Sequence, residues 1–378
     1  MTPRNCLAAL CALLLALSGM PADAAKKKPR RSAATTQPVA AQAKADFGGR
    51  DEVREFIVQL AAKHGFVESE LRFVFSRARH YPAIIELITP PAHPRARSWQ
   101  AYRARFIEPV RIQGGIALWN KYAGDLARAE AQYGVPAEVI VAIIGVETVY
   151  GRNSGNWRVI DALSTLAFDY PKRAEFFRSE LENYLLFARE HDLDVFSVRG
   201  SYAGAIGIPQ FMPSSWRKWA VDFDGDSRID LRDSFVDSIG SVASFLKGHG
   251  WEAGAPIAYP AQVTGDAYKE FLARDILPTI PIAELARFGV RSESLTRRGL
   301  PPDTPTALVD LVTPDKPTEY WVGLKNFYVI TRYNRSSFYA MSVMELGAAI
   351  REARRERQQP VGTVSSTGGY AGNTPVER

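Results

Sequence analysis

The spacing of apolar residues along the chain predicts a protein built mainly of helices. Apolar side chains recur three and four positions apart through several long segments, as they do on the buried face of a helix. The region 253–320 differs, because prolines and short apolar runs there predict a small insert of strands with one helix at 268–273. We therefore expect a mainly α, α+β fold. The predicted helices span 51–80, 99–130, 136–150, 174–190, 236–249 and 342–354, with loops at 81–98 and 200–213.

Glu147 is the most conspicuous polar residue in this pattern, because it lies near the end of an otherwise apolar helix. One and two turns before it stand Ile140, Ile143 and Ile144. Burial against such residues disfavours the ionised form and raises a carboxyl pKa. An acid that stays protonated near neutral pH suits general acid catalysis. A structural ion pair accounts for the same residue as well, so the helix alone leaves both roles open.

The first residues have the pattern of a secretion signal. Arg4 supplies the positive charge, 7–17 is apolar but too short to span a bilayer, and Ala24 ends a small-x-small cleavage pattern. Met20 occupies the place of a lipoprotein cysteine, so we expect a soluble exported protein with no transmembrane anchor. The only cysteines, Cys6 and Cys11, lie in this predicted signal peptide of 1–24.

The formal net charge of +6 is concentrated near the N-terminus. Residues 25–45 carry six basic residues and no acidic one, whereas from Asp46 onward there are 40 of each. We expect a disordered basic linker at 25–45 and a disordered tail at 355–378. The balanced charge of the body gives no support to nucleic-acid binding.

An Asp-rich segment predicts a structural calcium site. Asp222, Asp224, Asp226 and Asp230 fall at positions 1, 3, 5 and 9 of an EF-hand-like loop. Ser227 stands at position 6, where such loops carry Gly. The closing acid at position 12 is Asp233, although Asp237 is an alternative, and an acidic turn without metal remains the competing interpretation.

Several ordered motifs together resemble one family. Glu147 belongs to the motif at 145–151, and further motifs follow at 162–170, 201–214, 222–230 and 330–340. This set resembles the lytic murein transglycosylase B family of the lysozyme-like superfamily over 47–354. The resemblance implies a helical domain at 46–130 completed by 321–354, a lysozyme-like catalytic core at 131–252, and the insert at 253–320.

The same resemblance implies the roles of individual residues. Glu147 would be the single catalytic acid and base, and Asp237 would replace Asp233 as the closing metal ligand. Ser201 would bind Glu147 or an acetamido group, polar amides would bind sugar groups, and tyrosines would stack on sugar faces. A turn hydroxyl and ordinary core packing are the competing interpretations. The implied substrate contacts are Ser201, Gln210, Tyr333, Asn334, Tyr339, Tyr102 and Arg173, and the implied metal residues are Asp222, Asp224, Asp226, Arg228 and Asp237.

The implied reaction is cleavage of peptidoglycan between N-acetylmuramic acid and N-acetylglucosamine, with a 1,6-anhydro product and no cofactor for the chemistry. Most glycosidases need a second carboxylate, for which Asp161 and Asp169 are candidates by sequence alone. A hydrolase that uses water and a non-catalytic cell-wall-binding protein are the alternatives. We expect a periplasmic monomer that binds glycan strands, with other cell-wall enzymes as possible partners.

Overall fold

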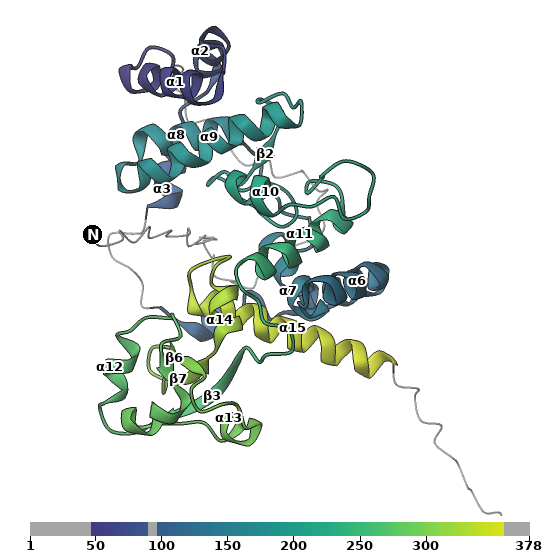
Figure 1. Cartoon of the computed structure of the whole chain (residues 1–378), viewed down its shortest axis with the longest axis vertical. Helices are drawn as coiled ribbons and strands as arrows, with labels where there is room; N and C mark the ends of the chain where they lie inside the picture. Colours follow the sequence, from purple (N-terminus) through teal and green to yellow (C-terminus); the bar gives the residue numbers. More distant parts are fainter. Residues whose placement is uncertain (1–46, 90–96, 359–378) are drawn as a thin grey trace, which may run out of the picture.

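The computed structural model describes residues 47–89 and 97–358. N-terminal helices form one end of the molecule, a central group of helices follows, and a small sheet forms the other end (Figure 1). The predicted signal peptide, the predicted linker and most of the predicted C-terminal tail lie outside the described residues. Within the tail, the prediction of disorder from residue 355 was wrong for its first four residues. Helix α15 (Ser337–Gln358) continues through them, supported by an Arg355–Glu352 ion pair at 2.8 Å.

The N-terminal helices pack on the antiparallel pair formed by α8 and α9. Arg50 binds Asp169 at 3.0 Å, and Lys63 binds Glu182 at 2.7 Å. The predicted single helix over 51–80 is broken at Gly65, which has a left-handed φ of 67°. The predicted loop that follows contains a further short helix. These elements are α1 (Asp51–His64), α2 (Glu68–Arg77), α3 (Pro82–Ile88), α8 (Val159–Asp169), η1 (Pro171–Arg173) and α9 (Ala174–Glu190).

Helix α7 (Ala137–Thr148) lies at the centre of the main hydrophobic core. Its side chains are apolar all around from Val139 to Val146, so other helices must cover every side. The predicted helix over 99–130 is three helices, because Pro109 begins a new one whose first amides bind the Glu108 carboxylate. The covering helices are α5 (Pro109–Lys121), α6 (Ala123–Tyr133), α11 (Phe235–Gly248) and α15; α4 (Trp99–Arg103), α10 (Pro213–Trp219) and α14 (Lys325–Ile330) complete the helical part.

The predicted strand insert is an antiparallel sheet with a small hydrophobic core of its own. Its strands are ordered β4-β6-β7-β3-β5, and Phe271, Leu285 and Leu308 belong to its separate apolar cluster. The predicted helix at 268–273 is present. The elements are β3 (Ala258–Val263), α12 (Tyr268–Leu272), β4 (Ile280–Pro281), η2 (Ile282–Phe288), β5 (Val290–Arg291), α13 (Glu293–Arg298), β6 (Pro305–Leu311) and β7 (Glu319–Gly323).

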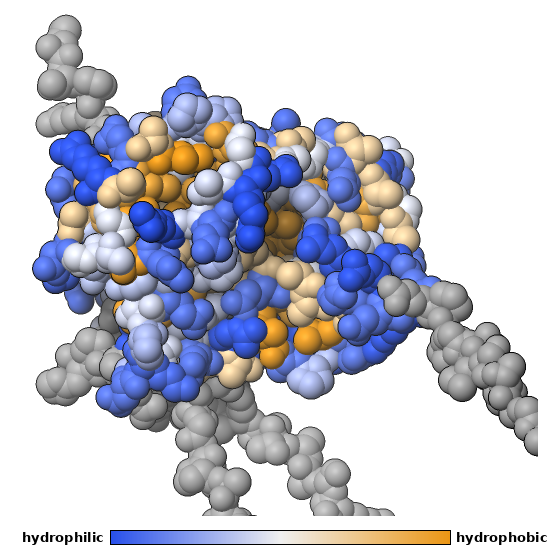
Figure 2. All heavy atoms as spheres, turned by 90° about the horizontal axis from the view of Figure 1, so that it is seen from below, coloured by the Kyte–Doolittle hydropathy of each residue, from blue (hydrophilic) through white to orange (hydrophobic). Residues whose placement is uncertain are grey.

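The predicted division into domains stays a prediction, but the contacts favour other boundaries in two places. Residues 47–89 lie against α8 and α9, whereas α5 lies against α7 and α15 and α6 lies against α7 and α11, so 46–130 is not one packed unit. Strand β7 also crosses the predicted boundary at 320. Hydrophobic residues reach the surface in patches among hydrophilic ones at the end of the molecule that carries the sheet (Figure 2).

Within the described residues, no single helix has the length and apolar composition needed to cross a membrane. Only α6 and α7 taken together pass that test, and the chain bends by 112° between them.

Candidate active site

The carboxyl of Glu147 lies at the C-terminal end of α7, where apolar burial meets a partly exposed surface. Ile140, Ile143 and Ile144 are fully buried beneath it, and the Glu147 side chain itself is partly exposed. Burial raises the pKa of Glu147 to about 7. The Tyr339 hydroxyl donates a hydrogen bond of 2.6 Å to Glu147 Oε1, and this bond opposes the rise. At neutral pH the group is therefore poised between acid and base.

A strained turn directly follows this carboxyl. Val149, Tyr150 and Gly151 have left-handed φ values of 52°, 60° and 78°. That conformation is unfavourable for a β-branched residue such as Val149, and it persists only where surrounding contacts hold it. One such contact is the Tyr150 hydroxyl, which donates to the Arg111 carbonyl at 2.7 Å. The turn fixes the direction in which the end of α7 presents Glu147.

Two glycines allow the Tyr150 ring to enter the α5–α7 contact. A Cβ added at Gly114 would lie 2.5 Å from an atom of that ring, and one added at Gly145 would lie 2.5 Å from the Tyr150 hydroxyl oxygen. The ring therefore fills the space that side chains at these positions would otherwise occupy. This explains why Gly145 interrupts the apolar face of α7 two residues before Glu147.

The predicted Gly-rich loop lies beside the end of α7 and is fixed from several sides. The short strands β1 (Trp157–Arg158) and β2 (Arg199–Gly200) pair with each other, and this pairing holds the segment after α7 next to the start of the Gly-rich loop. Gly207 has a φ of 79° and lies so close to the Leu231 carbonyl that an added Cβ would be 2.3 Å from its oxygen. Only glycine fits there. The loop therefore packs directly on the Asp-rich segment.

The two tyrosines predicted to stack on sugar make other contacts. Their rings lie parallel, with centroids 6.4 Å apart and an interplanar angle of 13°. Tyr333 donates to the Pro209 carbonyl at 2.6 Å, and Tyr339 is 2% exposed. Tyr339 thus offers little ring surface to a sugar and instead contacts the carboxyl of Glu147 directly.

The two amide residues predicted to bind sugar, Asn334 and Gln210, differ in whether their side-chain polar atoms have hydrogen-bond partners. Asn334 is 7% exposed, and its Oδ1 has no hydrogen-bond partner among the residues that the structure describes. A buried acceptor without a partner costs free energy and points to a ligand or water. Gln210 has a left-handed φ of 53°, and its Nε2 donates to the carbonyls of Ser154 and Gly207, both at 3.0 Å.

The remaining predicted contacts are placed in three different ways. The Ser201 hydroxyl accepts the Ala205 amide at 3.1 Å, which is the contact expected of a turn hydroxyl. Tyr102 lies close enough to Glu147 for the carboxylate charge to affect the Tyr102 hydroxyl. Burial and then that charge raise the pKa of Tyr102 to about 12. Arg173 lies over the rings of Phe176 and Phe177 at the start of α9.

Both candidates for a second catalytic carboxylate are held in ion pairs. Asp161 is fully buried, binds Arg158 at 2.7 Å, and accepts the Arg79 amide at 2.9 Å. Asp169 binds Arg50 and also lies 3.4 Å from a nitrogen of His80. These contacts join α8 to the N-terminal helices, so the structure assigns both acids a packing role.

Three predicted metal residues come together in the Asp-rich segment. Asp222, Asp224 and Asp237 offer carboxylate oxygens within 4.8 Å of one another. Asp237 is 1% exposed, and Ser227 has the left-handed φ of 71° that position 6 requires. The converging oxygens fit a hard cation such as calcium.

The other acids of this segment contribute differently. Asp226 and Asp233 are not in that group of oxygens. The Asp226 carboxylate instead accepts the Arg228 amide at 2.8 Å, and the Asp233 amide donates to Asp230 at 3.2 Å. Of the two alternatives left open by the sequence, the geometry favours Asp237 as the closing ligand.

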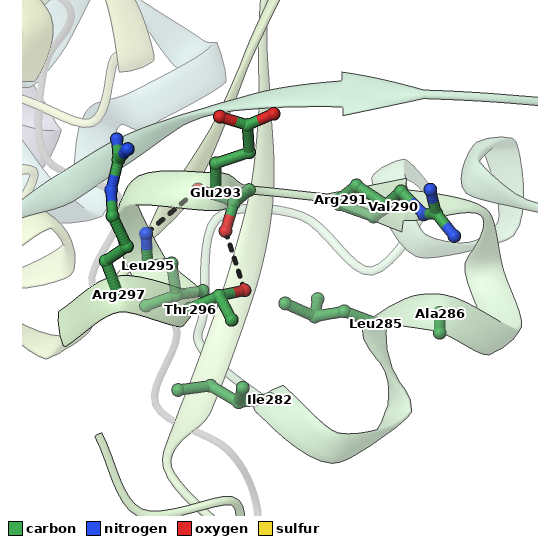
Figure 3. Close-up of a pocket in the computed structure, with 10 residues that line it drawn as sticks. Ile282, Leu285, Ala286, Val290, Arg291, Glu293, Leu295, Thr296 and Arg297 are labelled. Carbon is green, nitrogen blue, oxygen red and sulfur yellow. Dashed lines mark hydrogen bonds between the residues drawn. The ribbon is translucent and has the colours of Figure 1, made fainter. Parts of the chain in front are cut away.

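A cavity of about 540 Å³ lies elsewhere, in the five-stranded sheet and its short helices from β3 to β7, which we call the sheet unit (Figure 3). Leu285 and Ile282 point into it, with Arg291, Glu293 and Arg297 around its rim. None of the predicted site residues lines it. The residues around Glu147 are therefore the better candidate for an active site, since they combine a carboxyl of raised pKa, an unpaired buried acceptor and local strain.

The sequence patterns missed the residues that hold this site together. Thr148 is fully buried, and Tyr150 adopts its strained conformation, yet neither was singled out. A usable signal was present: Thr148 is a second polar residue directly after Glu147 in an apolar helix. The contact between Tyr339 and Glu147 carries no local signal, because 192 positions separate the two residues.

Comparisons with known proteins agree with this geometry. A family model described as transglycosylase SLT domain matches residues 48–348. Membrane-bound lytic murein transglycosylase B from Escherichia coli (strain K12) is 42% identical over 323 residues, covering 82% of this chain and 85% of that protein. The catenated lytic transglycosylase SltB1 from Pseudomonas aeruginosa has a TM-score of 0.76 at 48% identity, covering 82% of this chain and 100% of that one. The Escherichia coli lytic transglycosylase Slt35, in complex with calcium, has a TM-score of 0.71 at 41% identity, covering 83% and 97%.

Proposed function

The chain belongs to the transglycosylase SLT domain family and is a lytic transglycosylase that cleaves peptidoglycan, and from this premise we propose that Glu147 carries out the reaction alone. The family resemblance and the mainly α, lysozyme-like fold predicted from the sequence are confirmed. The observation that supports the proposal is the pKa of about 7 at Glu147, on a helix end where the Tyr339 hydroxyl binds its carboxylate. Since Asp161 and Asp169 are held in ion pairs, a one-carboxylate mechanism fits better than a two-carboxylate one.

In the first step, Glu147 acts as general acid. Its proton passes to the glycosidic oxygen between N-acetylmuramic acid and N-acetylglucosamine, and the bond from that oxygen to C1 of the muramic ring breaks. The 2-acetamido oxygen of the same ring stabilises the positive charge that develops at C1. The apolar surroundings of Glu147 keep a useful fraction of it protonated near neutral pH.

In the second step, Glu147 acts as general base. The carboxylate takes the proton of the muramic 6-hydroxyl, whose oxygen bonds to C1 and closes the 1,6-anhydro ring. Glu147 is thereby protonated again, and no water is consumed. Tyr339 stabilises the ionised form between the two steps, because its hydroxyl donates to the carboxylate oxygen.

Substrate binding would use the polar groups around this carboxyl. The unpaired Oδ1 of Asn334 would accept a hydrogen bond from a sugar hydroxyl or amide. Tyr102 would contact a sugar near Glu147, and Tyr333 would chiefly hold the loop at Pro209. Ser201, Gln210 and Arg173 stay candidates for further contacts.

We also propose that the Asp-rich loop binds structural calcium through Asp222, Asp224 and Asp237. Slt35 was solved in complex with calcium, which supports a metal in this family. The ion would neutralise the clustered carboxylates and stiffen the loop, with no part in the chemical step.

The location of the protein is likewise a proposal. Peptidoglycan as substrate requires an exported enzyme, and the predicted signal peptide would supply export to the periplasm. The Escherichia coli relative is described as membrane-bound, whereas Met20 here replaces a lipid-acceptor cysteine. We propose a soluble periplasmic monomer, which fractionation of cells and N-terminal sequencing of the mature protein would test.

The mass of the reaction product tests the proposed chemistry. Purified peptidoglycan digested by the enzyme should release 1,6-anhydro-muropeptides, which are lighter by one water than the products of hydrolysis. Hydrated products would contradict the proposal in favour of a lysozyme-type hydrolase. Sacculi that bind the protein but stay intact would favour a non-catalytic binding protein.

A further inference from the structure

The hydroxyl of Thr148 links three segments at the end of the catalytic helix. Thr148 is 0% exposed. Its Oγ1 donates to the Ile208 carbonyl at 2.8 Å and accepts the Gly151 amide at 2.9 Å. The Ile144 carbonyl lies further away, at 3.3 Å from Oγ1. The hydroxyl therefore joins α7, the strained turn after it, and the Gly-rich loop in one buried contact.

Ile208 is also held from its other side. Its amide donates to the Leu231 carbonyl at 2.7 Å, in the Asp-rich segment. The same segment is closed by Asp237, whose carboxylate accepts the Asp230 amide at 2.8 Å. Ile208 thus receives one hydrogen bond from the catalytic helix and donates one to the loop that carries the metal residues.

These contacts bear on the direction of the catalytic carboxyl. A non-glycine residue in a left-handed turn is unfavourable and persists only because its surroundings over-determine it. Thr148 supplies one hydrogen bond to Gly151 in that turn and another to the neighbouring loop. Since Thr148 directly follows Glu147, loss of these bonds would let the carboxyl shift, and a misplacement of about 1 Å costs on the order of 10²-fold in rate.

We propose that Thr148 is a positioning residue for Glu147 and that, through Ile208, it transmits the conformation of the Asp-rich loop to the catalytic carboxyl. This inference rests on the proposed role of Glu147. Thr148 touches neither substrate nor the reacting atoms, and acts only through the geometry of the turn.

A purely structural role for Thr148 predicts different results, and the chain offers a matched control. Thr306 is also 0% exposed, and its hydroxyl donates to the Ile280 carbonyl at 2.6 Å, in the sheet unit. Replacing either threonine with valine preserves shape and leaves a buried carbonyl without its donor. Each change should therefore lower the Tm, and by a similar amount in the two variants.

The first experiment compares Thr148→Val, Thr148→Ser and Thr306→Val in kcat and KM on purified peptidoglycan and in thermal unfolding. Thr148→Val should lower kcat by at least roughly tenfold, while KM changes little. Thr148→Ser keeps the hydroxyl and should recover most of kcat. Thr306→Val should lose similar thermal stability and keep kcat. Wild-type kcat in Thr148→Val, or no recovery in Thr148→Ser, would overturn the positioning role.

The second experiment measures transmission without measuring activity. Adding calcium to chelated wild-type protein should slow hydrogen–deuterium exchange in a peptide covering 145–153, and Thr148→Val should abolish that change while Thr306→Val retains it. Calcium-independent exchange in the wild type would overturn the transmission. The proposed function is judged separately, by anhydro products from the wild-type enzyme, so its failure would be distinguishable from failure of this inference.

Discussion

The sheet unit and the end of α7 differ in whether their buried polar groups have hydrogen-bond partners and in where their backbone is strained. In the sheet unit, strands pair in antiparallel register and the buried Thr306 hydroxyl has its acceptor at 2.6 Å. At the end of α7, Glu147 lies on isoleucines, the Oδ1 of Asn334 has no partner among the described residues, and Val149 is held in a left-handed conformation. The left-handed non-glycine residues of the sheet unit are aspartates, Asp275 and Asp315, which tolerate that conformation, whereas at the end of α7 a β-branched valine adopts it.

This difference indicates where stability has been given up for chemistry. Local conflicts in an otherwise consistent structure concentrate at functional sites. The sheet unit contains the cavity of about 540 Å³, yet among its described residues no buried side-chain polar atom lacks a hydrogen-bond partner. The conflict around Glu147 is therefore the more informative sign of the active site.

The largest effect is expected from removing the acid. Glu147→Gln should lower kcat by about 10²–10⁴, the usual contribution of general acid–base catalysis, while glycan binding is retained. Release of anhydro-muropeptides is the measurement. Glu138→Gln, at the other end of the same helix, removes a carboxylate that binds Arg351 and should keep activity. Turnover of Glu147→Gln within roughly tenfold of the wild type would remove Glu147 as the acid.

Removal of calcium should destabilise the catalytic region next most strongly. At a calcium concentration about 100 times the dissociation constant, bound metal stabilises the fold by about 2.7 kcal/mol. A chelator should therefore lower the Tm measured by calorimetry. Asp237→Asn should abolish this response and Asp233→Asn should preserve it, because only Asp237 belongs to the converging carboxylates. The reverse pattern would restore Asp233 as the closing ligand.

The same Glu147→Gln variant should be more stable than the wild type at alkaline pH. The folded pKa of Glu147 is about 7 against an ordinary 4.5, so the wild type loses stability as pH rises between these values. Below pH 4.5 the carboxyl is neutral in both states and the difference vanishes. At pH 8 the variant should gain about 1–3 kcal/mol in denaturant unfolding. If wild type and Glu147→Gln were equally stable at pH 8 as well as below pH 4.5, the burial of this carboxyl would be contradicted.

The smallest effect concerns the hydrogen bond from Tyr339. That bond lowers the pKa of Glu147, so Tyr339→Phe should raise it. The midpoint above which kcat/KM declines should move up by roughly half to one pH unit. Tyr333→Phe removes a hydroxyl bound to Pro209 instead and should leave the midpoint in place. A downward shift in Tyr339→Phe would show that the bond favours the protonated acid.

Local patterns determined much of this protein. The spacing of isoleucines placed Glu147 on an apolar face, which the structure shows, because neighbours along a helix are fixed by its period. Alternate Asp residues predicted the metal segment, and glycines predicted the loop at 200–213, whose position beside Glu147 only the family resemblance implied. Helix lengths were less accurate, since single residues such as Gly65 and Pro109 divided segments whose apolar spacing continued.

Only the tertiary structure decided which distant residues act together. Tyr339 reaches Glu147 across 192 positions and Thr148 reaches Ile208 across 60, and neither contact follows from any local period. Packing also engaged Asp169 in an ion pair with Arg50, 119 positions away, and brought Asp237 to the metal segment. A hydrogen bond requires its donor and acceptor to be placed to within a few tenths of an ångström, and the arrangement of whole helices sets that placement. The sequence therefore determined which chemical groups are available, and packing determined which of them meet.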